Sequence, residues 1–320
     1  MPANSSRVSR SMQAPDDSAD RTMTRLTAND FHPDVLRLFD QYVHARLSRA
    51  EFVAAAAKFA KPGESGESLL EALSPNFAQG RQVQPDDPRI HTESVRVDSP
   101  EGHGWVRGDL VKPTRFSGKL PGILVAHENR GLNPHIQDIA RRLALEGFVV
   151  FAPDALSAVG GYPGDEDAAR ELFKTLDVDK IRADFLAATR HLNGRPEVSG
   201  RYGAVGFCFG GGIVNFLATR LPDLGAAVPF YGAAPPSEEV PHIKAPLLIH
   251  YAENDERPNA RWPAYKQALE AAKSPYEMHL YPGTQHGFNN DTTPRYDAAA
   301  AGLAWARTLR FFNTHLMDGS

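Results

Sequence analysis

The chain has 320 residues, of which 42% are hydrophobic and 9% aromatic, and its formal net charge is −4. This composition is ordinary for a soluble globular protein, and the weak negative charge excludes the basic surface that nucleic-acid binding requires. Its single cysteine cannot form an intrachain disulfide, and no apolar run approaches the ~18 residues of a membrane span. We therefore expect a cytoplasmic protein that acts on small molecules.

The first part of the chain predicts a tail followed by helices. Residues 1–28 are rich in Ser, Asp, Arg and Thr and have almost no large apolar side chains, which predicts a flexible tail. Residues 29–89 predict a helical extension and a linker. Apolar side chains recur at helical spacing from Pro33 to Leu47, and two shorter helices are expected over 48–59 and around 69–73.

One stretch of this extension raises the question of export. Residues 47–60, LSRAEFVAAAAKFA, faintly resemble a twin-arginine signal. They contain one arginine where that signal needs two adjacent ones, and they lie far from Met1. A surface helix is the better interpretation, and export stays open as the alternative.

From residue 90 to residue 320, strand patterns alternate with helical patterns. A hairpin is expected at 94–98 and 104–111, and further strands at 122–127, 148–153, 202–207, 226–232, 245–251 and 276–282. Helices are expected near 134–146, 166–176, 180–193, 209–221, 260–272 and 296–316. This alternation predicts an α/β fold with a mainly parallel, doubly wound sheet. His250 and His279 lie inside strand patterns and are assigned to packing.

The sequence Gly206-Phe207-Cys208-Phe209-Gly210 lies where a predicted strand turns into a predicted helix. It has the G-x-nucleophile-x-G pattern, with cysteine in place of serine. Such a turn needs glycine on both sides because the backbone is too tight for Cβ atoms, and it directs the helix N-terminus at the thiol, which favours the thiolate. The alternative is that Cys208 is a small buried hydrophobic residue.

An acid and a histidine follow Cys208 in the chain order expected of α/β-hydrolases. Asp255 and His286 both lie in polar loops after predicted strands, at the sheet edge where α/β proteins build their sites. His286 would take the thiol proton and later assist water, and Asp255 would hold the imidazole in its tautomer. Glu253 and Glu256 are alternatives to Asp255.

The segment HENRGLNPHI, residues 127–136, follows another predicted strand. Glu128 at a buried strand end is a candidate for controlling the state of the thiol, and an ion pair with Arg130 or Arg141 is its structural alternative. The backbone N–H groups of Asn129 and Phe209 would form the oxyanion hole.

With these motifs the sequence resembles the dienelactone hydrolase family of α/β-hydrolases. The matching segments are HENRGLNPHI, APD at 152–154, VGFCFGG and QHGF, and the resemblance covers residues 90–316. This resemblance implies the α/β-hydrolase fold, with Cys208 as nucleophile and with Asp255 and His286 completing the triad. It also implies that Glu128 interacts with the thiol and keeps it unreactive until substrate binds. The family's namesake reaction is the hydrolysis of 4-carboxymethylenebut-2-en-4-olide to maleylacetate, without metal or organic cofactor.

The sequence departs from this family at the substrate-carboxylate site. The dienelactone-specific members have an arginine four residues after the catalytic histidine, where this chain has Asn290. Arg170 is the candidate for a second carboxylate-binding arginine. Alternatively, it is an exposed helix residue that pairs with Glu166. Tyr162 and Phe288 are candidates for lining an apolar substrate pocket, and their alternative role is in the core.

The resulting prediction is a cysteine-dependent hydrolase of small carboxylic esters or lactones, similar to carboxymethylenebutenolidase. We expect no cofactor and no metal, a small-molecule partner rather than nucleic acid or membrane, and a homodimer as the candidate assembly. Two alternatives stay open. One is a thioesterase or peptidase on the same triad, and the other is a binding or redox-responsive protein in which Cys208 reacts without turnover.

Overall fold

The computed structural model describes residues 25–317, so most of the predicted tail, residues 1–24, lies outside the described part. The centre of the molecule is one eight-stranded sheet in the order β1-β2-β4-β3-β5-β6-β7-β8. Its strands are β1 (Ile90–Ser99), β2 (Gly104–Pro113), β3 (Leu120–Ala126), β4 (Val149–Asp154), β5 (Val198–Phe207), β6 (Ala226–Phe230), β7 (Leu247–Asn254) and β8 (Tyr276–Gln285). The first two form the predicted antiparallel hairpin, and β2 pairs antiparallel with β4. All further neighbours in the sheet, from β4 and β3 across to β8, pair in parallel. The predicted mainly parallel α/β-hydrolase fold is thus confirmed.

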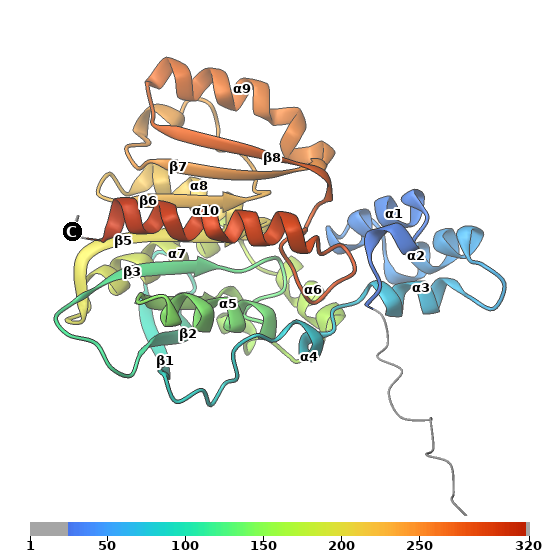
Figure 1. Cartoon of the computed structure of the whole chain (residues 1–320), viewed down its shortest axis with the longest axis horizontal. Helices are drawn as coiled ribbons and strands as arrows, with labels where there is room; N and C mark the ends of the chain where they lie inside the picture. The colour runs from blue at the N-terminus through green and yellow to red at the C-terminus, as the bar shows by residue number, and fades with distance from the viewer. Residues whose placement is uncertain (1–24, 318–320) are drawn as a thin grey trace, which may run out of the picture.

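Helices cover both faces of this sheet (Figure 1). One core cluster joins the sheet to α7 (Val178–Asn193), α8 (Phe209–Arg220) and α9 (Glu256–Ala272), and the other joins it to α5 (Pro134–Leu145) and α10 (Ala298–Leu316). The two clusters share the strands because side chains alternate between faces: in β3, Leu124 belongs to the first cluster and Ile123 to the second. A shorter helix, α6 (Glu166–Lys174), follows the 3₁₀ helix η3 (Ala155–Val159), and η4 (Val240–His242) precedes β7.

The segment before the sheet folds into small helices with a separate core. These are η1 (Ala28–Asp30), α1 (Pro33–Val43), α2 (Arg49–Ala56), η2 (Ala57–Phe59), α3 (Gly66–Leu73) and α4 (Phe77–Gly80). Their buried apolar residues, including Val35, Phe39 and Phe52, pack against one another as a third cluster. The first helix ends at Val43, before the expected Leu47, and Ala45 has φ +59°, so the chain turns away directly after His44.

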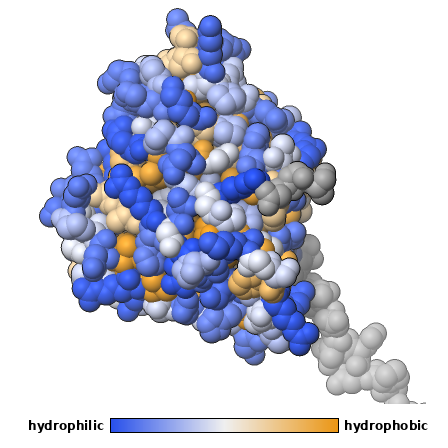
Figure 2. All heavy atoms as spheres, turned by 90° about the vertical axis from the view of Figure 1, so that its left-hand side faces the viewer, coloured by the Kyte–Doolittle hydropathy of each residue, from blue (hydrophilic) through white to orange (hydrophobic). Residues whose placement is uncertain are grey.

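This N-terminal extension lies beside the edge of the sheet toward which the arrows of β3 and β6 point (Figure 1). The turns that follow β3, β5, β7 and β8 lie at that same edge, because parallel strands present their carboxyl ends together. At the opposite end of the molecule, the surface is mainly hydrophilic, with hydrophobic side chains interspersed (Figure 2). Among the described helices, none is long and apolar enough to cross a membrane.

Candidate active site

Cys208 occupies the tight turn between β5 and α8. Its backbone has φ 55° and ψ −112°, in the positive-φ region that residues with a side chain rarely adopt. The flanking glycines permit the turn. A Cβ on Gly206 would lie 2.2 Å from the carbonyl oxygen of Gly210, and a Cβ on Gly210 would lie 2.1 Å from that of Ala126. The turn therefore has the geometry of a nucleophile elbow, with Cys208 at the N-terminus of a helix.

Asp255 and His286 form a buried hydrogen-bonded pair at the ends of β7 and β8. Nδ1 of His286 lies 2.5 Å from Oδ2 of Asp255, and the two residues are 5% and 4% exposed. Glu253 and Glu256 are exposed, so of the three candidate acids it is Asp255 that contacts the histidine. Burial by itself would lower the pKa of His286, but the charges of Asp255 and Cys208 raise it to about 9.

The thiol has two histidines beside it, one of them from the N-terminal extension. A ring nitrogen of His44, a ring nitrogen of His286 and the sulfur of Cys208 lie within 4.8 Å of one another. Nε2 of His44 is 3.4 Å from the sulfur, whereas Nε2 of His286 has no hydrogen-bond partner among the described residues. Two imidazoles and a thiolate are donors that suit zinc. The guanidinium of Arg257, whose Nη2 lies 2.9 Å from Nδ1 of His44, opposes a cation at this position.

Glu128 follows β3 and lines a small pocket of about 50 Å³ together with Cys208. Its Oε2 accepts a hydrogen bond from Nδ2 of Asn290 at 3.1 Å. Asn290 also lines this pocket, so the residue at the expected arginine position contacts Glu128 and faces the thiol. The amide consequently holds one oxygen of the carboxylate that was expected to control Cys208.

The two arginines that could have paired with Glu128 are paired elsewhere. Nε of Arg130 lies 3.8 Å from Glu166, and Nη2 of Arg141 lies 3.6 Å from Asp138. Among the described residues no ion pair joins Glu128 to either arginine, although the charge of Glu128 still opposes the lowering of the Arg130 pKa by burial.

Arg170 lies in the contact between the main domain and the N-terminal extension. It is 3% exposed, its Nη1 donates to the carbonyl oxygen of Tyr42 at 3.1 Å, and its guanidinium stacks 3.9 Å from the centroid of the Tyr42 ring. It is thus neither an exposed residue paired with Glu166 nor a residue that lines the pocket at Cys208.

Tyr162 and Phe288 also lie away from the pocket lining. The hydroxyl of Tyr162 donates to Glu166 at 3.0 Å. Phe288 is fully buried, with its ring 5.7 Å from that of Tyr231. Neither lines the pocket beside Cys208, so Phe288 takes the core role that was its alternative.

Of the two predicted oxyanion-hole residues, Phe209 follows Cys208 directly in the chain and Asn129 lines the pocket beside it. Phe209 is the first residue of α8, so its amide has no acceptor within the helix. The side chain of Asn129 donates to the carbonyl oxygen of Val43 at 2.8 Å, which ties the loop after β3 to the end of α1. The pocket at Cys208 includes Asn129 among its lining residues.

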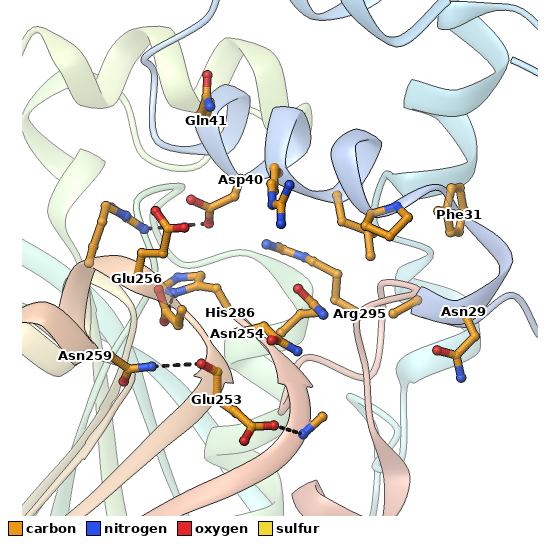
Figure 3. A pocket seen from close by; sticks show the side chains of 18 of the residues that line it. Asn29, Phe31, Asp40, Gln41, Glu253, Asn254, Glu256, Asn259, His286 and Arg295 are labelled. Carbon is orange, nitrogen blue, oxygen red and sulfur yellow. Dashed lines mark hydrogen bonds and ion pairs between the residues drawn. The ribbon is translucent and has the colours of Figure 1, made fainter. Parts of the chain in front are cut away.

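Sequence reasoning missed the residues of the extension and of the loops that enclose the site. A larger pocket of about 840 Å³ lies between α1 and the loops after β7 and β8, and it includes Asp40, Arg257 and Arg295 together with His286 (Figure 3). No motif singled out these side chains or His44, which is one of twelve histidines. Their signal is the packing of α1 against the site, which no local pattern contains.

The fold and this constellation define the class: an α/β-hydrolase that is a carboxylic ester hydrolase acting on small molecules. The family model described as "Dienelactone hydrolase family" matches residues 106–316, and the chain belongs to that family. A second model, described as "YqhI-like", matches residues 23–61, within and just before the helical extension.

Individual relatives agree with this assignment. The chain is 32% identical to the "Putative carboxymethylenebutenolidase" of Synechocystis sp. (strain ATCC 27184 / PCC 6803 / Kazusa), over 71% of this chain and 99% of the relative. It is 54% identical to the "Putative hydrolase fragment YghX" of Escherichia coli (strain K12), over 34% of this chain and 94% of that protein. The crystal structure of a "Putative Dienelactone Hydrolase" from Klebsiella pneumoniae subsp. pneumoniae MGH 78578 superposes with a TM-score of 0.61 and 30% identity, covering 69% of this chain and 98% of the other.

Proposed function

We propose that this protein hydrolyses small carboxylic esters or lactones through a covalent acyl-enzyme on Cys208, with His286 and Asp255 as the other triad members. The observation that carries the proposal is the 2.5 Å hydrogen bond between His286 and Asp255. The imidazole of His286 lies beside the thiol of Cys208, which sits in a tight turn with positive φ. A base oriented by an acid next to an elbow thiol is the arrangement that nucleophilic catalysis needs.

The chemistry follows from these positions. The sulfur attacks the ester carbonyl, and the oxyanion that forms would be stabilised by the amides of Phe209 and Asn129. His286 then exchanges protons with the leaving oxygen and with the water that releases the acid, while Asp255 compensates the charge of its ring. Glu128, held by Asn290, lies where a substrate entering the small pocket would meet it.

The substrate class is expected to include esters that carry an anionic group. Arg295 is 8% exposed and lines both pockets, and its Nε and Nη1 are buried without a hydrogen-bond partner among the described residues. An anionic group of the substrate would supply the missing acceptor. Arg295 is therefore the candidate to bind the substrate carboxylate in place of the family's arginine, whose position is occupied here by Asn290.

Three sequence-based predictions belong to the same proposal. The boundary of the catalytic domain is placed at residue 90, where β1 begins. The assembly is a homodimer, and the location is the cytoplasm.

The test is steady-state hydrolysis of a dienelactone and of an uncharged p-nitrophenyl ester by wild type, Cys208→Ala, His286→Ala and Asp255→Asn. Each triad variant is expected to lose about 10³-fold or more in kcat, because triad members act as a unit. His91→Ala, which removes an exposed histidine of β1, is the matched control and should keep full activity. Circular dichroism checks that each variant is folded.

Each other outcome has a defined meaning. Full activity of Cys208→Ala would refute the cysteine mechanism. Faster turnover of thioesters or amides than of oxygen esters would favour the thioesterase or peptidase alternative. Stoichiometric labelling of Cys208 by an ester without regeneration of the free thiol would favour a binding or redox-responsive protein.

A further inference from the structure

A second aspartate–histidine pair approaches Cys208 from the N-terminal extension. His44 directly follows the last residue of α1, and its Nε2 lies 3.4 Å from the sulfur. On the other side of the ring, Nδ1 lies 2.7 Å from the carbonyl oxygen of Asp40 and 3.2 Å from its carboxylate. The rings of His44 and His286 meet edge to face, 4.8 Å between centroids, so both histidines lie next to the same thiol.

The neighbours of His44 determine its tautomer. Nδ1 faces two oxygen acceptors, both from Asp40, so Nδ1 carries the hydrogen and donates it. Nε2 of the neutral ring is then an acceptor, and two donors lie within reach of it: the thiol of Cys208 at 3.4 Å and Nη2 of Arg257 at 2.5 Å.

Two opposite charges lie beside His44: the guanidinium of Arg257 and the carboxylate of Asp40. The guanidinium of Arg257 lies against the ring, 2.9 Å from Nδ1, and opposes a positive charge on the resting imidazole. Burial tends to raise the pKa of Asp40, but His44, His286 and Arg257 lower it below its usual range. Asp40 is therefore ionised and stabilises an imidazolium when one forms.

The extension is fixed to the catalytic domain at the point where His44 emerges. The carbonyl oxygen of Val43 accepts hydrogen bonds from Asn129 at 2.8 Å and from Arg130 at 3.2 Å. The next residue back, Tyr42, is held by Arg170. Three side chains of the main domain thus bind the last turn of α1 and fix the backbone directly before His44.

We propose that His44 is a further catalytic residue, the base that accepts the proton of the Cys208 thiol, so that the N-terminal extension completes the active site. This inference rests on the proposed function and changes one step of it, because it transfers thiol deprotonation from His286 to His44. Against the effect of burial, the charge of Asp255 raises the pKa of His286 and favours its protonated form, which can give a proton to a leaving group and leaves deprotonation of the thiol to His44.

The protons balance over one turnover. In acylation the S–H bond breaks and its proton goes to Nε2 of His44, sulfur bonds to the carbonyl carbon, and the leaving oxygen departs with the proton of His286. In deacylation neutral His286 takes a proton from water, the hydroxide oxygen bonds to the acyl carbon, and the C–S bond breaks. The sulfur then recovers its proton from His44. Both histidines return to their starting states, and the net reaction is ester hydrolysis.

The experiment measures acylation and deacylation separately for His44→Gln in the full chain, by stopped-flow detection of p-nitrophenolate in the presence of EDTA. Gln keeps a hydrogen-bond acceptor of similar reach but cannot take a proton. We expect acylation at pH 7 to fall about 100-fold, the usual scale of a general base, with deacylation within about twofold of wild type. His91→Ala is the matched control for removal of a histidine.

A second variant separates catalysis from a structural role. His44→Ala should show the same loss of acylation and regain part of it when free imidazole is added, since a small base can occupy the vacated position. Alkylation of Cys208 by iodoacetamide should also slow about tenfold at pH 7 in both variants, as expected when an acceptor of the thiol proton is lost.

Two results would overturn the inference: acylation by His44→Gln at the wild-type rate, or an acylation defect in His44→Ala that imidazole leaves unchanged while His44→Gln is unaffected. These results are distinguishable from failure of the proposed function, because that failure would appear as activity in Cys208→Ala. An inactive Cys208→Ala beside a fully active His44→Gln would reject His44 as the base and leave the triad proposal intact.

Discussion

Arg295 is a charged residue whose surroundings leave it incompletely paired. Its guanidinium lies 5.0 Å from the centroid of the Phe39 ring, and among the described residues no hydrogen-bond acceptor contacts its buried Nε or Nη1. A buried cation without an acceptor costs free energy unless a ligand completes it. This side chain lines the pockets next to Cys208 and His286, so the anionic group of the proposed substrate would recover that cost there.

Replacing Arg295 by Gln should therefore separate charged from neutral esters. We expect KM for an ester that carries a carboxylate to rise about 10- to 100-fold, the scale of one or two lost charge-assisted hydrogen bonds, while kcat/KM for a neutral ester stays within about twofold. Steady-state kinetics with both esters measures this, with the exposed Arg261→Gln as control. An equal loss on both esters would argue against an anion site.

At the scale of elements, the turn from β5 into α8 depends on close backbone contacts at glycines, where an added Cβ atom would clash. Gly210 faces the carbonyl oxygen of Ala126 in β3, and Gly211 faces that of Phe230 in β6, where an added Cβ would lie 2.6 Å away. Gly212 differs, because its nearest neighbour would be the Cβ of Ala233 at 3.6 Å, an ordinary contact. The tight packing of helix against strands at the first two positions is what holds Cys208 above the sheet.

This difference gives a matched pair of substitutions in one helix. Gly210→Ala should lower the free energy of unfolding by about 2 kcal/mol or more and reduce activity, since rigid backbone must move to admit the methyl group. Gly212→Ala should be neutral or stabilise by up to about 1 kcal/mol, the gain in helix propensity. Urea unfolding and ester hydrolysis measure both, and equal stabilities of the two variants would contradict the assignment.

At the scale of the whole molecule, two units with separate hydrophobic cores meet at the pocket beside Cys208. The helical extension has its own core, whereas the catalytic domain has a cluster on each face of its sheet. Polar groups join the units: Arg142 donates to the carbonyl oxygen of Gly80 at 3.1 Å, and Gln82 donates to Asp291 at 2.9 Å. An ion pair also crosses between them, with Arg257 3.7 Å from Asp40. The extension is thus attached through hydrogen bonds and ion pairs, and this attachment brings Asp40 and His44 to Cys208.

Global stability should depend on pH through His250, which is fully buried in β7. Its nitrogens contact the hydroxyls of Tyr281 and Thr308 at 2.9 and 3.2 Å. Burial keeps its pKa in the folded protein well below the ordinary value of 6.5. As the pH falls below 6.5 the unfolded chain takes up a proton that the folded chain refuses, so the stabilisation present above 6.5 is lost toward lower pH.

We predict that His250→Gln is less stable than wild type at pH 7, but that its free energy of unfolding falls less between pH 6.5 and pH 5 because part of the wild-type decline is missing. The missing part should reach at most about 1.4 kcal/mol per pH unit, the contribution of one proton. Urea unfolding across this range measures it, and His91→Gln, at an exposed position, should keep the wild-type slope. Parallel slopes for wild type and His250→Gln would refute the assignment.

Much of the fold and the central part of the site could be predicted because their signals are local. The elbow is contained in five consecutive residues around Cys208, and the alternation of strands and helices is a property of short windows. The interpretation of Arg170 as a substrate-binding residue failed, because its neighbours come from a distant part of the chain. Arg170 contacts Tyr42, which lies 128 residues earlier, and no spacing rule predicts that contact.

The sequence by itself determined that this protein is an α/β-hydrolase with a cysteine elbow and with an acid and a histidine after later strands. Periodicity, glycine spacing and chain order are enough for that, because parallel strands bring their carboxyl ends to one edge. Only the tertiary structure decided that Asp255 rather than Glu253 or Glu256 contacts His286, and that His44 reaches the thiol. These are contacts between side chains 31 and 164 residues apart, and packing alone sets which of several chemically equivalent groups comes within hydrogen-bond distance.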